Sequence, residues 1–221
     1  MKSRFVWPLL LICGLFASHA AVATDIEYEV TITNLTRGNN FTPILVASHR
    51  SGVALFELGS RAGAELATLA EGGDTGPLDA LLSSNRRVAD TNTSEGLLAP
   101  GATVSIKIKA SHWTRRISLA SMLLPTNDAF FALNGVALPR GRRQVTYLAP
   151  AYDAGSEAND ELCFNIPGPT CQGEGASPGA GGEDFVHIHA GIHGIGDLSP
   201  AAYDWRNPVA RITIRRVSSY Y

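Results

Sequence analysis

Two acidic loops contain the residues best suited to metal chemistry in this sequence of 221 residues. The first loop reads Leu-Pro-Thr-Asn-Asp-Ala and contains Asp128, and the second reads Tyr-Asp-Ala-Gly-Ser-Glu and contains Asp153 and Glu157. Calcium takes roughly six to eight hard oxygen ligands, which carboxylates on adjacent loops and main-chain carbonyl groups can supply. Asp153 and Glu157 lie on either side of Gly155, so a tight loop can turn both toward one ion. The composition allows a calcium site here, although spacing alone favours a solvated acidic loop.

A histidine-rich segment is a second candidate metal site, formed by His187, His189 and His193. In a strand His187 and His189 point to the same face, and a turn at Gly191 returns His193 toward them. Three imidazoles with an open position suit zinc or copper, which makes a His-ligated metalloenzyme the alternative function. The other interpretation is polar packing against the sheet or a hydrogen-bonded loop anchor. Elsewhere the sequence has no nucleophile elbow, P-loop or His-Glu-x-x-His motif, so it favours a protein that is not an enzyme.

The elements that must position these loops are mostly β-strands. Apolar and polar residues alternate over several segments, which is typical of half-buried strands. Because few helical patterns separate these segments, an antiparallel sandwich or barrel is favoured over a parallel sheet. The predicted strands cover residues 26–33, 44–48, 104–109, 116–122, 145–148, 185–189 and 210–215. A helical insertion is predicted over residues 61–71 and 77–82, stopped by glycines after the first part.

The N-terminus has the features of a secretory signal peptide. Lys2 and Arg4 precede an apolar run over residues 5–16, and Ala-Val-Ala ends at residue 23. We therefore predict a signal peptide over 1–23, a single domain over 24–221, and a secreted or periplasmic location. No later apolar run is long enough to span a membrane. The net charge of −2 gives no basic field for nucleic acid.

Two cysteines remain once the predicted signal peptide is removed. Cys163 and Cys171 lie on either side of a segment containing Pro167, Gly168 and Pro169. In an oxidising compartment their most economical arrangement is a disulfide with each other. The sequence therefore predicts a local covalent clip in the loop that follows the second acidic loop. Trp205, just before the last predicted strand, is expected to pack inward.

The alternating strands and the two acidic loops together resemble the spondin domain, first known from F-spondin, over most of residues 25–217. The resemblance implies an antiparallel β-sandwich similar to the calcium-and-lipid-binding sandwich of synaptotagmin. It also implies that calcium is held by Asp128, Asp153 and Glu157, with two departures from the family pattern. Ala129 replaces an aromatic residue, and Glu157 replaces a shorter Asp. The implied function is a non-catalytic, calcium-stabilised module for adhesion or for binding an extracellular protein or glycan; a structural envelope protein with solvated acids is a further alternative.

Overall fold

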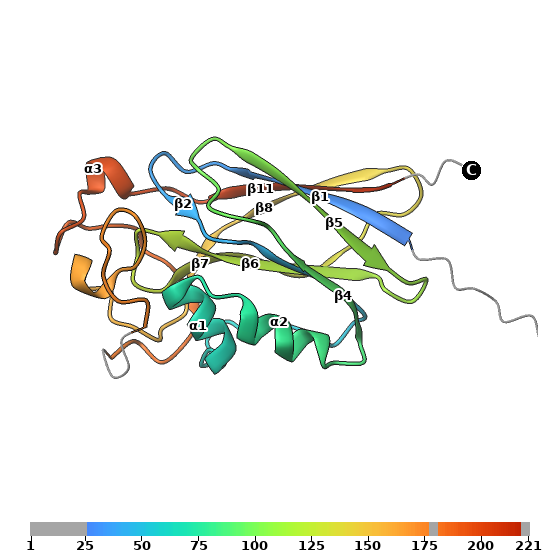
Figure 1. Ribbon diagram of the computed structural model, residues 1–221, viewed down its shortest axis with the longest axis horizontal. Coiled ribbons are helices and arrows are strands. Elements are labelled where there is room, and N and C mark those ends of the chain that lie inside the picture. The colour runs from blue at the N-terminus through green and yellow to red at the C-terminus, as the bar shows by residue number, and fades with distance from the viewer. Residues whose placement is uncertain (1–25, 177–180, 218–221) are drawn as a thin grey trace, which may run out of the picture.

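The computed structural model describes residues 26–176 and 181–217 of the chain (Figure 1). In this part, strands form two antiparallel sheets and the helices are few and short. The predicted all-β sandwich with a short helical insertion is therefore confirmed. The predicted signal peptide over 1–23 lies outside the described residues, and the single domain over 24–221 remains a prediction.

The first sheet has the strand order β5-β1-β11-β8 and shows the alternation expected from the sequence. In β1, Val30 and Ile32 are fully buried and lie opposite Ile214 and Ile212 of β11. Their sequence neighbours face outward, because successive side chains in a strand point to opposite faces. The strands are β1 (Ile26–Asn34), β5 (Thr103–Ala110), β8 (Gln144–Ala149) and β11 (Ala210–Arg216).

The second sheet has the order β10-β9-β7-β6-β3-β4, and β2 pairs with β6 beside it. It contains strands that the alternation did not predict, above all β7, whose first five residues are all buried. The predicted strand over 185–189 is shorter in the structure, where only two residues pair. The strands are β2 (Asn40–Phe41), β3 (Leu45–His49), β4 (Val88–Thr93), β6 (Arg116–Leu124), β7 (Ala129–Ala137), β9 (Ala151–Asp153) and β10 (His187–Ile188).

The helical insertion covers the outer face of this second sheet, as Figure 1 shows below β6. It consists of α1 (Ala64–Gly72) and α2 (Gly76–Ser83), close to the predicted bounds. The middle strands of the second sheet, β3, β6 and the first half of β7, are thus buried on both faces. Phe131 packs in the core between the sheets, whereas its neighbour Phe130 packs in a second core under the helices. A strand covered on both faces needs apolar residues at every position, which removes the alternation from the sequence.

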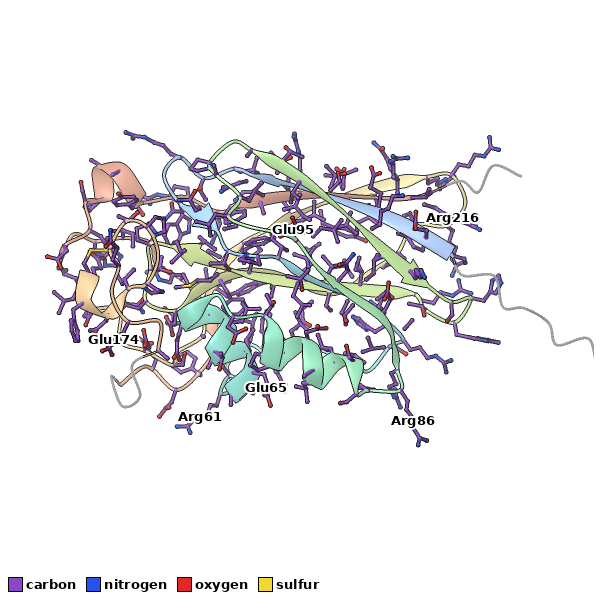
Figure 2. All side chains as sticks on the ribbon, in the orientation of Figure 1. Arg61, Glu65, Arg86, Glu95, Glu174 and Arg216 are labelled. Carbon is purple, nitrogen blue, oxygen red and sulfur yellow. A yellow bond between two sulfur atoms is a disulfide. The ribbon has the colours of Figure 1, made fainter. Side chains whose placement is uncertain are left out.

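Long loops gather at one end of the sandwich, where they position the acidic residues. They include η1 (Cys163–Asn165) and α3 (Pro200–Tyr203), and Figure 2 shows Glu174 at this end and Arg216 at the other. The predicted disulfide between Cys163 and Cys171 is present in this region. The prediction that Trp205 packs inward is also confirmed, because its side chain is buried in the core between the sheets.

Removal of the disulfide should weaken the fold without abolishing it. In the chain-entropy description, a loop this short stabilises the folded state by about 2–3 kcal/mol. We expect Cys163→Ser to lower the free energy of unfolding by that amount in guanidinium titrations, with native far-ultraviolet circular dichroism retained. Cys171→Ser should give the same loss, and the double variant no more than either, because all three lack the same bond. An unfolded single variant, or one as stable as wild type, would contradict this.

Candidate metal site at the loop end

Strand pairing brings the two predicted acidic loops together. Asp128 immediately precedes β7, and Asp153 is the last residue of β9. These strands are adjacent, and Ala129 is the residue directly opposite Asp153 in their antiparallel register. The main-chain N–H of Ala154 also donates to the carbonyl oxygen of Asp128 at 3.3 Å. Asp128 and Asp153, which are 25 positions apart in the sequence, therefore meet at the loop end of the second sheet.

Asp128 is anchored through only one of its carboxylate oxygens. Its Oδ2 accepts hydrogen bonds from the main-chain N–H groups of Ser156 at 2.8 Å and Glu157 at 3.1 Å. Its Oδ1 is buried and receives no hydrogen bond from a donor in the described part of the chain. A buried carboxylate oxygen without a donor is energetically unfavourable unless a proton or a cation occupies that position.

Asp153 is held on both oxygens and lies close to Asp128. Its Oδ1 accepts from the main-chain N–H of Gly155 and its Oδ2 from the side-chain amide of Asn159, each at 2.7 Å. The charge of Asp153 also acts on Asp128, whose pKa it raises. Two buried carboxyl groups this close hold a proton more readily than isolated ones, because ionising both would bring two negative charges together.

Burial raises the pKa values of both acids, and repulsion between their negative charges adds to the effect on Asp128. Burial, followed by the charge of Asp153, raises the pKa of Asp128 to about 7, against the hydrogen bonds from Glu157 and Ser156. Burial also raises the pKa of Asp153 to about 6, although the bonds from Asn159 and Gly155 oppose this. The charge of Glu183 raises both pKa values further. The pair therefore holds a proton that two solvated carboxylates would release below neutral pH.

Gly155 is required for the tight turn between the two acids of the second loop. Its φ of 65° lies in the left-handed region, which glycine adopts without strain. A Cβ atom here would also lie 2.4 Å from the carbonyl oxygen of Phe185, closer than any side chain can approach. The turn thus brings the 185–187 segment against the acidic loop.

Glu157 contacts Asp128 through its main chain. Its N–H donates to Asp128, and its side chain is only 1 % exposed. The three predicted calcium ligands are therefore all buried at the same end of the sandwich, on the two loops that the sequence indicated. Three acidic side chains buried this close in the fold are unusual, because Asp and Glu are mostly exposed in folded proteins.

All three predicted histidines line one cavity of about 190 Å³ next to Asp153. Two of their rings are close to its carboxylate. His187 Nδ1 lies 3.6 Å from Asp153 Oδ1, and His189 Nε2 lies 3.8 Å from Oδ2. The exposed His193 ring lies 3.5 Å from the carbonyl oxygen of Ala190. All three side chains therefore line the same cavity, but only the rings of His187 and His189 are shown beside Asp153, an acid that the spacing of the histidines did not indicate.

His189 uses both ring nitrogens for hydrogen bonds within the protein. Nδ1 accepts from the main-chain N–H of Gly191 at 2.9 Å, which leaves Nε2 protonated and able to donate to Asn159 Oδ1 at 3.1 Å. Burial, with the neighbouring His187 and His193, lowers the pKa of His189 to about 4. His189 is thus a neutral, hydrogen-bonded loop anchor, the second interpretation that the sequence left open.

Glu161 is an anchor that sequence reasoning missed. Its buried carboxylate accepts from three successive main-chain N–H groups, those of His193, Gly194 and Ile195. It adopts a left-handed φ of 58°, which is uncommon for a residue other than glycine. Successive N–H groups that converge on an anion form a nest, and here the nest is filled by the protein's own side chain. No local sequence pattern marks such a long-range contact.

Glu183 is a second acidic residue that the sequence did not single out. Among the described residues, Asp153, Glu183 and His187 each offer a ligand atom, and these atoms all lie within 4.8 Å of one another. Glu183 is exposed, His187 is half-buried and Asp153 is buried. The carboxylate of Asp153 is therefore common to this group and to the calcium ligands that the resemblance implied.

A comparison of the sequence with models of known protein families gives a match that agrees with this arrangement of strands and acidic loops. The family model described as Spondin_N matches residues 32–165. The chain belongs to the spondin N-terminal domain family. The match runs from within β1 to η1, which is narrower than the resemblance over 25–217. A search of curated proteins finds no match to the chain.

The matched part of this spondin domain contains Asp128, Asp153 and Glu157, and it ends before Glu183, His187, His189 and His193. The spondin domain family is extracellular, and the disulfide of this chain is consistent with that location. Among the described residues, no helix combines the length and apolar character that crossing a bilayer requires.

Proposed function

We propose that this spondin domain protein is a secreted or periplasmic, non-catalytic module whose binding surface is stabilised by calcium. The ligands would be Asp128, Asp153 and Glu157, and the partner an extracellular protein or glycan bound in adhesion at the cell envelope. The observation that carries the proposal is the burial of Asp128 and Asp153 on neighbouring strands, where no described residue donates to one oxygen of Asp128.

The donor set fits a hard divalent cation. All three side chains offer carboxylate oxygen, the ligand that calcium prefers. In the described part of the chain, the basic side chains nearest Asp153 are the imidazoles of His187 and the neutral His189, and no salt bridge joins Asp128 to a Lys or Arg. A cation here would balance charge that the protein itself leaves poorly compensated.

Asp128 and Asp153 hold the second acidic loop against the second sheet. Asp128 binds the main chain of the second acidic loop, and Asp153 binds Asn159 in the same loop. When bound, calcium would supply the positive charge that lets both acids ionise together. The loops around them would then keep one arrangement at neutral pH, which is what a binding surface built from loops requires.

The alternative of a His-ligated metalloenzyme has less support. A catalytic site with three histidine ligands needs a lone pair from each ring. His189 accepts a hydrogen bond on Nδ1 and donates from Nε2, so this arrangement leaves it no lone pair for a metal. We therefore propose no catalysis at His187, His189 and His193.

Calcium should stabilise the wild-type protein modestly and selectively. Extracellular modules bind calcium with a Kd of about 0.1–1 mM. At about 1 mM calcium, mass action then adds about 0.4–1.4 kcal/mol, or about 1–5 °C in Tm for a chain of this size. Magnesium should not reproduce the shift, because it demands a tighter octahedron. Differential scanning calorimetry in calcium, magnesium and chelator measures this directly.

Two variants serve as controls in the same calorimetric experiment. Glu157→Asp restores the shorter acid of the family and should keep the calcium shift. Glu95→Gln, which removes an exposed acid on the loop after β4, should respond like wild type. Equal shifts with calcium and magnesium, or none with either, would refute the proposal.

A further inference from the structure

We propose that Asp153, Glu183 and His187 form a second metal site, for a divalent transition-metal ion of the zinc class. The site adjoins the proposed calcium ligands and shares Asp153 with them, but it requires neither Asp128 nor Glu157. It also differs from the three-histidine site that the sequence suggested, because one of its ligands is a histidine and two are carboxylates.

The spacing of His187 and Asp153 matches two ligands of one metal ion. Their nearest atoms, Nδ1 and Oδ1, are 3.6 Å apart, which is too long for a hydrogen bond. Zinc lies about 2.0–2.2 Å from nitrogen and oxygen ligands, so two ligands in a tetrahedral shell are about 3.4 Å apart. The observed separation is within a few tenths of an ångström of that value.

His187 Nδ1 has no other role in the described structure. The atom is buried, yet it makes no hydrogen bond with any described residue. The register places His187 directly opposite Asp153 across the β10–β9 ladder, and its ring also contacts Phe185, with centroids 5.1 Å apart. A buried ring nitrogen held toward a carboxylate, beyond hydrogen-bonding distance, is suited to ligation.

The third ligand and the space around it complete the site. Glu183 is exposed, so its carboxylate can adjust to an ion at the mouth of the cavity, and its ligand atom already lies within 4.8 Å of the other two. The cavity of about 190 Å³ is lined by all three residues. Three protein ligands beside an open cavity leave a position for water or for a group from a bound partner.

Other residues of the cavity hold Asp153 in place. Gly191 donates to His189, His189 donates to Asn159, and Asn159 donates to Asp153 Oδ2. Such outer hydrogen bonds orient a ligating carboxylate in metal sites. The buried, neutral His189 is thus a positioning residue in this proposal and not a ligand.

The ligand types select the class of metal. An imidazole nitrogen favours zinc, copper, nickel or iron over calcium and magnesium, which prefer oxygen alone. Two carboxylates balance the charge of a divalent ion. The neighbouring set at Asp128, Asp153 and Glu157 has only oxygen donors, so the two sets differ in the chemistry they select.

The test is zinc binding by the purified secreted protein without an affinity tag. After chelation and dialysis, we expect wild type to take up one zinc per chain by isothermal titration calorimetry and elemental analysis. His187→Ala should weaken zinc binding at least about 100-fold, since outer-shell changes alone cost about 10–100-fold. His193→Ala, a histidine of the same cavity outside the ligand set, should bind like wild type. Cobalt should give a tetrahedral visible spectrum that His187→Ala lacks.

Calcium titrations of the same proteins separate the two sites. His187→Ala should keep the calcium shift, and Asp128→Asn should lose it while still binding zinc. Failure of the calcium proposal would therefore leave the zinc result intact. The zinc proposal is overturned if wild type takes up no zinc, or if His187→Ala binds it as tightly as wild type.

Discussion

Replacing Asp153 by Asn should lower calcium affinity about 100-fold, the largest effect we expect from one substitution at the site. The affinity of a calcium site depends on the number of charged ligands, and Asn keeps the shape of Asp but removes its charge. Asp153 also lies close enough to Asp128 for its charge to raise the pKa of that carboxyl group. A Kd of about 0.1–1 mM would then rise to about 10–100 mM, far above the calcium concentration of the experiment, and the thermal shift would disappear.

The substitution also disturbs the local hydrogen bonds. Both oxygens of Asp153 accept from fixed donors, Gly155 and Asn159, so the amide of Asn replaces one acceptor with a donor. We expect the calcium-free Asp153→Asn protein to lose about 1 kcal/mol of stability. Calorimetric titration measures the affinity, with Glu95→Gln as the matched control. A variant that responds to calcium like wild type would remove Asp153 from the site.

Replacing Asp128 by Asn should stabilise the calcium-free protein above neutral pH. Burial raises the pKa of Asp128 from 3.8 to about 7. Between these pH values the folded protein therefore holds a proton that the unfolded chain releases. The stability from this group is complete below about pH 3.8 and is lost as the pH rises through about 7. Asn is neutral throughout, and its amide can donate to Asp153 from the position of the donor-free Oδ1.

The measurement is the free energy of unfolding in chelator, from about pH 5 to pH 8. Relative to wild type, Asp128→Asn should gain about 3 kcal/mol over this range, because each pKa unit is worth about 1.4 kcal/mol. The titration of His189, whose lowered pKa gives stability that is lost as the pH falls, is present in both proteins and cancels. With saturating calcium the advantage of the variant should shrink or reverse. Parallel pH curves in chelator would contradict this account.

Much of the fold could be predicted from the sequence because the first sheet has one face in the core. In β1, β5 and β11, buried residues alternate with more exposed ones, as burial of one face requires. The same reasoning missed β7, in which Phe130 and Phe131 both enter apolar cores on opposite faces. It also missed β4, where residues such as Asp90 and Asn92 lie on an edge strand that is mostly polar.

The acidic loops could be identified from composition, but their meeting could not. Asp128 and Asp153 are adjacent because Ala129 pairs with Asp153, and β7 and β9 were not among the predicted strands. Their strong effect on each other's pKa depends on that register and on burial. Residue types therefore allowed calcium ligands and the family resemblance implied them, while the burial that makes an ion favourable came from the structure.

The contacts of Glu161 and Glu183 could not be predicted from the sequence, for a different reason. Glu161 binds main-chain groups about 32–34 residues away, and main-chain donors have no sequence signature. Glu183 follows a glycine-rich segment without strand or helix periodicity. Its position beside His187 depends on the close approach of Gly182 and Gly155, where a Cβ on Gly182 would lie 2.4 Å from the carbonyl oxygen of Gly155.

The most direct test of the proposed calcium site is a crystal structure of the protein grown in millimolar calcium, with anomalous scattering to locate the ion. We predict one calcium ion bound by the carboxylates of Asp128, Asp153 and Glu157, at distances of about 2.3–2.6 Å. No calcium at this position would contradict the central claim.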